Sequence, residues 1–157
     1  MDYIRNGLPP DVTPQGEIGP DAIADLLGRT PIFSELSDRH LKSLAREVKV
    51  RYIEPQEFVV RRGEGGLGFY LILAGEVDVR KGSRSLAKLG AGQFFGEMAL
   101  FDSQPRSADV VTTRPTAVGV LSRWEFEAFA ETHHGVYKGM LHELTRRLRE
   151  TNQSLSE

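Results

Sequence analysis

The spacing of apolar residues divides the chain into helical and strand-like parts. In residues 21–48, apolar side chains recur every three or four positions and form two stripes: Ile23, Leu26 and Leu27, then Leu41, Leu44, Ala45 and Val48. This spacing predicts two short helices. We expect Asp21 to cap the first helix and Gly28 to end it, and we expect Ser37 to cap the second.

Between residues 49 and 121 the helical spacing gives way to short runs of β-branched and aromatic residues. The clearest runs are 58–60, 69–73, 77–79 and 117–121, and glycine or proline turns separate them. Short strands at regular intervals are typical of a sandwich or barrel. The 16 glycines of the chain agree with an architecture rich in tight turns.

After residue 121 the helical spacing returns. The run 122–125, Ser-Arg-Trp-Glu, is a capping box and predicts a helix that carries Phe126 and Phe129. A last helix is expected after Gly135, with a stripe in heptad spacing formed by Tyr137, Leu141, Leu144, Leu148, Thr151 and Leu155. Such a stripe favours a homodimer through Tyr137, Leu141, Leu144 and Leu148. The alternative is that these residues fold back over the barrel as a lid.

Length and composition place these elements in one domain with appendages. The chain has 157 residues, a net charge of −2, 39% hydrophobic residues and no cysteine. This charge excludes a global basic field for nucleic acid or anionic membranes, and the lack of cysteine excludes disulfides and thiolate metal sites. The longest apolar run, 69–74, is too short to span a bilayer, and the N-terminus lacks the apolar core of a signal peptide. We therefore expect a cytoplasmic protein.

Four regions follow from these patterns. Residues 1–20 contain four prolines and three glycines without periodicity, which predicts a flexible arm. Residues 21–48 form the N-terminal helical segment, and residues 49–121 form the barrel with its candidate site at 94–108. Residues 122–157 supply a hinge and the helices of the lid or dimer seam.

One glycine pattern imitates a dinucleotide-binding loop. The run 63–68, Gly-Glu-Gly-Gly-Leu-Gly, has the required glycine spacing. That loop must open a helix, however, whereas this run leads into the apolar strand of residues 69–73. We therefore interpret the glycines as a turn.

The residues with the clearest chemical purpose lie in 94–100, Phe-Phe-Gly-Glu-Met-Ala-Leu, and in 105–108, Pro-Arg-Ser-Ala. Gly96 followed by a single helical turn would present unpaired backbone amides, and Arg106 would add a permanently charged planar fork, so the two favour a bound phosphate. Glu97 would be repelled by that phosphate unless it accepts a hydrogen bond from a sugar hydroxyl. A phosphate and a hydroxyl this close together indicate a cyclic nucleotide.

These residues resemble the cyclic nucleotide-binding domain family, which includes cyclic-AMP receptor proteins and kinase regulatory subunits. The resemblance covers residues 30–148 and rests on 95–100 and 105–108, the phosphate-binding cassette, with support from Gly63-Glu64, Phe69-Tyr70 and 73–77. It implies an α+β fold: an antiparallel β-roll or jelly-roll barrel of about eight strands. The resemblance also implies N-terminal helices, a short cassette helix and C-terminal helices.

The resemblance implies a role for each part of the cassette. Gly96 and Ala99 would offer backbone amides, Glu97 would hold the ribose 2′-hydroxyl, and Arg106 with Ser107 would hold the cyclic phosphate. The full set of expected ligand-binding residues is Phe95, Gly96, Glu97, Met98, Ala99, Arg106, Ser107, Ala108, Val79, Leu86 and Ala87. Residues 137–147 would lie against the base.

Two residues depart from the family's pattern. Ser107 stands where a threonine would have suggested cyclic GMP, so the ligand is expected to be cyclic AMP rather than cyclic GMP. Asp109 brings a further anion close to the phosphate, where it would either weaken binding or tether Arg106. The resulting prediction is a sensor domain that is not an enzyme and that converts ligand binding into movement of its C-terminal helices, which act on a downstream protein.

Three other functional interpretations compete with the sensor domain. Glu97 and Arg106 could pair with each other in an interaction module that has lost nucleotide binding. A cupin-like metalloenzyme would need histidines in the barrel, but His40, His133, His134 and His142 all lie outside residues 49–121. Only nine residues follow Leu148, too few for a helix-turn-helix module, so we expect no DNA binding. The charge run that includes Arg146 and Arg147 is then a solvated face.

Overall fold

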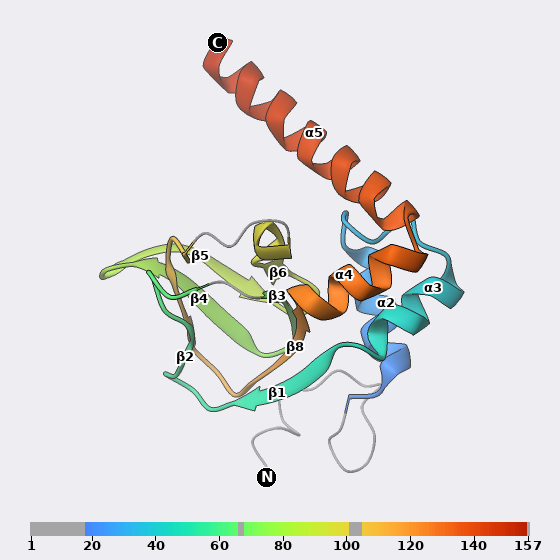
Figure 1. The fold of residues 1–157 in the computed structure, drawn as a ribbon. Helices are drawn as coiled ribbons and strands as arrows, with labels where there is room; N and C mark the ends of the chain where they lie inside the picture. The colour runs from blue at the N-terminus through green and yellow to red at the C-terminus, as the bar shows by residue number, and fades with distance from the viewer. Residues whose placement is uncertain (1–17, 66–67, 101–104, 157) are drawn as a thin grey trace.

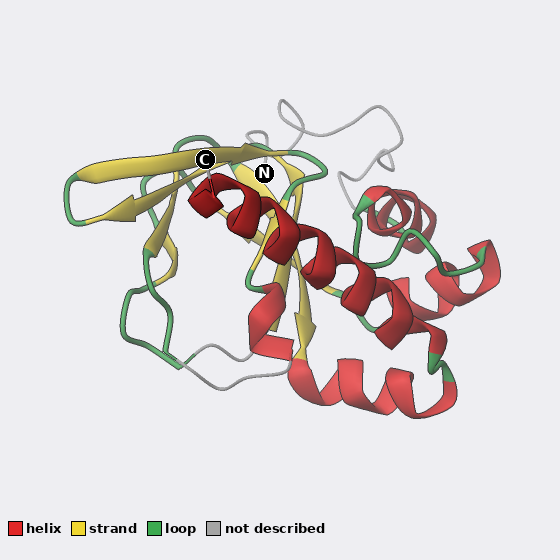
Figure 2. Cartoon of the chain, turned by 90° about the horizontal axis from the view of Figure 1, so that it is seen from above, coloured by secondary structure: helices red, strands yellow, loops and turns green. Residues whose placement is uncertain are grey.

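Two four-stranded antiparallel sheets form a β-roll, with the helices gathered at one end (Figures 1 and 2). The computed structural model describes residues 18–65, 68–100 and 105–156. Most of the predicted arm, part of the 63–68 turn and part of the 94–108 segment therefore lie outside the described residues. The first sheet has the order β1-β8-β3-β6 and the second β2-β7-β4-β5. The predicted α+β fold with an antiparallel roll of eight strands is confirmed.

Each strand in Figure 1 has defined bounds. The strands are β1 Lys49–Ile53, β2 Phe58–Val60, β3 Gly68–Ala74, β4 Glu76–Lys81, β5 Arg84–Gly90, β6 Phe94–Phe95, β7 Asp109–Thr112 and β8 Thr116–Ser122. Strand β3 is apolar at nearly every position because both of its faces are covered: Leu71 and Leu73 pack toward the helices, and Ile72 packs between the sheets. The inter-sheet core closes around Val77, Val110 and Val118.

The N-terminal helices, α2 (Pro20–Arg29) and α3 (Asp38–Ala45), pack against each other. The predicted cap at Ser37 is confirmed, because its side chain accepts a hydrogen bond from the His40 amide. The predicted cap at Asp21 is wrong, since Pro20 already occupies the first helical turn and Gly19 is the capping residue. The predicted end at Gly28 is also wrong, because α2 continues to Arg29. A Cβ at Gly28 would approach Leu41 Cδ1 to 2.9 Å, so this glycine allows close helix packing.

The C-terminal helices are α4 (Arg123–Thr132) and α5 (Gly135–Ser156). The predicted capping residue Ser122 is confirmed, because its hydroxyl accepts from the Glu125 amide. The N-terminal half of α5 packs against the domain, with Val136 and Met140 buried. Gly139 lies close to the Ile32 backbone, because a Cβ at this position would be 2.6 Å from the Ile32 carbonyl oxygen.

The C-terminal end of α5 extends away from the rest of the molecule (Figure 1). Leu141 and Leu148 of the predicted heptad stripe are exposed, whereas Leu144 is partly buried. The Leu155 side chain lies outside what the structure describes. No helix in the described ranges combines the length and the apolar character needed to cross a bilayer.

Candidate functional site

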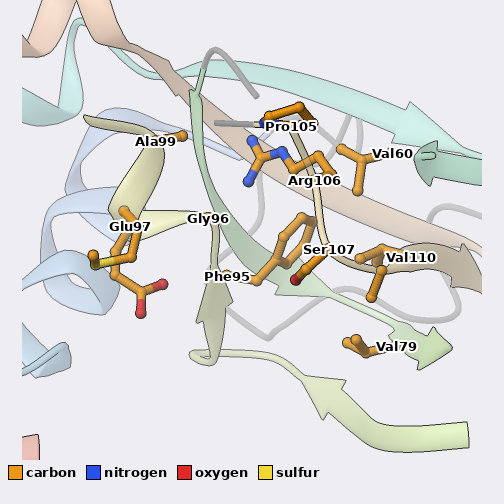
Figure 3. Close-up of a pocket in the computed structure, with 12 residues that line it drawn as sticks. Val60, Val79, Phe95, Gly96, Glu97, Ala99, Pro105, Arg106, Ser107 and Val110 are labelled. Carbon is orange, nitrogen blue, oxygen red and sulfur yellow. The ribbon is translucent and has the colours of Figure 1, made fainter. Parts of the chain in front are cut away.

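A pocket of about 250 Å³ opens between the two sheets beside the short 3₁₀ helix η1 (Glu97–Leu100), as Figure 3 shows. The volume of this pocket is slightly smaller than the roughly 300 Å³ of the smallest typical small-molecule sites. Its lining residues are Val60, Val79, Phe95, Gly96, Glu97, Met98, Ala99, Pro105, Arg106, Ser107, Ala108 and Val110. The pocket thus brings together nine of the eleven residues predicted from the sequence, and adds Val60, Pro105 and Val110.

The other two predicted residues, Leu86 and Ala87, lie on β5 outside this lining. Val79 pairs with Ala87 and Arg80 pairs with Ser85, so Leu86 is the extra residue of a β-bulge. Its side chain is 45% exposed. The bulge changes which side chains of β5 face the roll, and strand alternation read from the sequence does not reveal it.

The segment 63–65 holds the backbone of Arg106 in place. The Gly63 amide donates to the Arg106 carbonyl oxygen and the Arg106 amide donates to the Glu64 carbonyl oxygen, both at 2.9 Å. Gly65 also forms a β-bridge with Pro105. The described part of the 63–68 glycine run is therefore a turn that positions the arginine.

The Arg106 guanidinium is partly buried and has few acceptors. Its Nη2 donates to the Gly68 carbonyl oxygen at 2.6 Å, and its Cζ lies 5.5 Å from the centre of the Tyr70 ring. Within the described residues, its Nε is buried and has no hydrogen-bond partner. Burial lowers the pKa of Arg106, while Tyr70 and Glu97 oppose that shift, so the group stays charged. A partly desolvated cation with an unused donor suits an oxyanion.

Gly96 makes this position of the arginine possible. Its φ is +82°, in the left-handed region, and a Cβ here would lie 2.4 Å from Arg106 Nη1 and 2.7 Å from the Gly68 carbonyl oxygen. Figure 3 shows the guanidinium directed toward Gly96. The predicted helical turn after Gly96 is confirmed as η1, but the Ala99 amide donates to the Gly96 carbonyl oxygen at 3.0 Å and is used within that turn.

Glu97 faces a partner that the sequence did not indicate. Its carboxylate is 17% exposed and forms an ion pair with Arg147 of α5, while Figure 3 shows it turned away from Arg106. The alternative in which Glu97 and Arg106 brace each other is therefore wrong, since each bonds elsewhere. The prediction that the charge run on the last helix is a solvated face is wrong for Arg147, whose side chain is partly buried and paired.

A buried carboxylate stands behind Arg147. Glu143 is 5% exposed and accepts from Arg147 Nε at 2.9 Å and from Arg146 Nη2 at 2.6 Å. The hydrogen bond from Arg146 is the main reason that the pKa of Glu143 lies below its ordinary value; burial opposes it and Arg147 adds to it. For Arg147, burial lowers the pKa, but the bonds to Glu97 and Glu143 outweigh it and raise the pKa overall. The only hint in the sequence is the i, i+4 spacing of Glu143 and Arg147.

Asp109 is satisfied away from the pocket. Its Oδ1 accepts from the Arg62 amide at 2.7 Å, and in β7 it pairs with Arg80 of β4, while its neighbour Val110 faces the pocket. Of the two alternatives for Asp109, the tether to Arg106 is therefore wrong. Strand alternation places this carboxylate on the opposite face from the pocket.

The histidines lie among the helices and not between the sheets. His40 and His133 meet edge to face, with ring centres 4.5 Å apart, and His142 Nδ1 lies 3.0 Å from Glu35 Oε1. Within the ranges that the structure describes, no three potential metal ligands gather.

Comparison with known proteins identifies relatives of this chain in sequence and in fold. The profile of the cyclic nucleotide-binding domain family matches residues 50–133, more than half of the chain. The cGMP-dependent protein kinase of Plasmodium berghei is 38% identical over 82 residues, which are 52% of this chain and 10% of the kinase. The chain therefore corresponds to a small part of that relative.

Two solved structures share the fold over most of the chain. The N-terminal domain of a transcriptional regulator from Streptomyces coelicolor A3(2) superposes with a TM-score of 0.77 at 25% identity and covers 85% of this chain and 96% of its own. The regulatory domain of Toxoplasma gondii PKA with cAMP superposes with a TM-score of 0.65 at 26% identity and covers 70% and 44%.

Proposed function

The chain belongs to the cyclic nucleotide-binding domain family, and we propose that its pocket binds cyclic AMP in preference to cyclic GMP. The observation that carries this proposal is the Arg106 guanidinium, which lines the pocket partly desolvated with its Nε unpartnered among the described residues. A cyclic phosphate supplies the acceptors that this group lacks. The PKA regulatory domain that shares the fold was crystallised in complex with cAMP, which favours the same ligand here.

Each part of the nucleotide has a counterpart in the pocket. Arg106 and Ser107 would hold the phosphate, Glu97 would accept from the ribose 2′-hydroxyl, and apolar walls from both sheets would contact the sugar and base. Those walls are Val60, Val79, Phe95 and Val110. The exposed Met98 lies at the rim nearest α5, where the base would meet residues 137–147.

The response to the ligand would pass through α5 to a protein partner. In this proposal the chain forms a homodimer through Tyr137, Leu141, Leu144 and Leu148, and the nucleotide changes the position of that helix. Leu141 and Leu148 are each 62% exposed, which favours the dimer seam over the alternative in which the same leucines fold over the pocket.

Titration calorimetry with cyclic AMP and cyclic GMP tests the ligand. We expect cyclic AMP to bind more tightly, and Arg106→Ala to weaken its binding by about 2–5 kcal/mol because the phosphate loses its charged partner. Arg114→Ala is the matched control, since Arg114 is exposed and absent from the pocket lining.

Three outcomes would contradict parts of this proposal. Equal losses for Arg106→Ala and Arg114→Ala would show that the phosphate binds elsewhere. Tighter binding of cyclic GMP would reverse the ligand preference. No heat with either nucleotide, on protein shown to be ligand-free, would favour the module that has lost nucleotide binding.

A further inference from the structure

An aromatic ring lies close to the Arg106 guanidinium. Arg106 Cζ is 5.5 Å from the centre of the Tyr70 ring, within the roughly 6 Å over which an aromatic face attracts a cation. Tyr70 belongs to β3 and packs against the inter-sheet core, as Val79 and Phe95 do. Among the described residues, however, Tyr70 is not part of the pocket lining. Its effect on a ligand would therefore pass through Arg106.

The Tyr70 ring is held in place by a second ring. Tyr70 of β3 and Phe95 of β6 are partners in the antiparallel register. Their rings stack with centres 4.8 Å apart and an angle of 2° between their planes. Strand pairing and stacking together restrict both side chains, so the Tyr70 ring gives the guanidinium a fixed surface.

The Arg106 guanidinium has no ion pair with a carboxylate in the described part of the chain. Glu97 pairs with helix α5, and Asp109 accepts from a backbone amide. The guanidinium itself donates to the Gly68 carbonyl oxygen. A carboxylate would occupy N–H donors that a phosphate needs, whereas an aromatic face attracts the cation without supplying an acceptor oxygen.

We propose that Tyr70, held by Phe95, is the positioning residue for Arg106: the face of its ring keeps the guanidinium in place for the cyclic phosphate, without a carboxylate as counter-ion. This inference rests on the proposed function and adds the group that prepares its phosphate-binding arginine. The attraction comes from the negative face of the ring. It should therefore depend on the electron density of the ring more than on its volume.

Titration calorimetry with cyclic AMP separates the ring of Tyr70 from its hydroxyl. Tyr70→Phe keeps the ring and should bind within about twofold of wild type. Tyr70→Leu removes the ring and should weaken binding roughly fivefold to thirtyfold, as expected for a partly desolvated cation–π contact. Phe94→Leu is the matched control, because it removes a ring of β6 that packs toward the helices beside Phe69, and it should keep the wild-type affinity.

A fluorination series tests the electrostatic part and does not depend on normal folding of Tyr70→Leu. Phenylalanine analogues with one, two or three ring fluorines at position 70 weaken the negative face of the ring in steps and change its size little. The affinity for cyclic AMP should fall in the same steps. The same analogues at position 94 should leave the affinity unchanged, because that ring packs in the core on the helix side.

Each contrary result has a distinct meaning. An affinity that stays constant along the series at position 70, or that falls equally along the series at position 94, would show that Tyr70 acts through packing alone and would overturn the inference. A loss for Tyr70→Phe as large as that for Tyr70→Leu would assign the effect to the hydroxyl and would also overturn it. If wild-type protein binds neither cyclic AMP nor cyclic GMP, the proposed function itself fails, and the inference fails with it.

Discussion

Gly96 and Arg106 operate as one unit at the level of single residues. The left-handed backbone at Gly96 and its missing Cβ leave the space that the Arg106 guanidinium occupies, and the Gly68 carbonyl oxygen holds that guanidinium in place. The missing side chain at Gly96 therefore makes room for the Arg106 guanidinium, and it affects a ligand through the position of that guanidinium. Gly96 is required both by its positive φ and by the lack of space for a Cβ. Gly63 has a positive φ but open space, so substitutions at the two positions separate these two effects.

We expect Gly96→Ala to lower the free energy of unfolding by more than Gly63→Ala. Both positions have positive φ, +82° and +86°, but a Cβ at Gly63 meets nothing within 4 Å, whereas one at Gly96 meets Arg106 Nη1 at 2.4 Å. Gly63→Ala should therefore report backbone strain alone, about 1 kcal/mol, and Gly96→Ala about 1–3 kcal/mol more. Urea denaturation measures both, and equal losses would contradict the steric role.

At the level of elements, the buried carboxylate of Asp78 ties β4 to β5 behind the pocket wall through a hydrogen bond. Asp78 on β4 is 5% exposed, accepts from Ser85 Oγ on β5 at 2.5 Å and from Arg80 Nε at 2.7 Å, and its neighbour Val79 lines the pocket. The bond from Ser85, then that from Arg80, hold the pKa of the Asp78 carboxyl below its ordinary 3.8, against the effect of burial. The bulge at Leu86 directly follows Ser85 on β5.

The pKa of Asp78 predicts acid sensitivity of this hairpin. Because the folded state holds the pKa below 3.8, the unfolded chain takes up the proton first as the pH falls. The stabilisation is thus complete above pH 3.8 and is lost as the pH drops through the lower folded value. Asp78→Asn should cost up to about 1 kcal/mol at pH 7, and the difference from wild type should shrink below pH 3.8.

Urea denaturation between pH 7 and pH 2.5 measures this loss. Asp25→Asn removes the carboxylate of a side chain that is 60% exposed and that pairs with Arg29 one turn along α2, so it is the matched control. A constant difference between Asp78→Asn and wild type across the whole pH range would show that the Asp78 carboxylate contributes nothing through its charge.

At the level of the whole molecule, α5 divides into a face that docks and a face that is open. Met140 and Glu143 are buried against the domain, while Leu141 and Leu148 point to solvent. Leu144 lies between these faces and lines a small void beside Glu97, so a change at Leu144 would disturb both. Leu148 is exposed, so a substitution there tests the dimer without disturbing the docked face.

We expect Leu148→Glu to reduce the mass measured by light scattering from two chains to one, because it places charges in the proposed apolar seam. Thr145→Glu adds the same charge at an exposed position of α5 outside the stripe and should leave the mass unchanged. A wild-type monomer at high concentration would end the dimer hypothesis.

Which features of the fold and the site the sequence predicts depends on how far apart along the chain the bonded residues lie. The caps at Ser37 and Ser122 and the turn after Gly96 involve groups within four residues, and each was predicted from local pattern alone. Glu97 finds its partner 50 residues along the chain, and Asp109 finds its partner 47 residues back. Such pairs depend on how helix α5 crosses the cassette and on which face a strand presents, and single-sequence periodicity specifies neither.

The anchoring of α5 at one end makes the helix a lever arm. Its 22 residues are held near Gly139, where the Ile32 carbonyl oxygen leaves no space for a Cβ, and its far end projects beyond the domain (Figure 1). At a rise of 1.5 Å per residue, the 17 residues from Gly139 to Ser156 reach about 25 Å, so a tilt of about 10° at the pivot moves the tip by about 4 Å. Under the proposed function, a small change of tilt at the pivot would thus present the tip of α5 to a protein partner at a clearly different position.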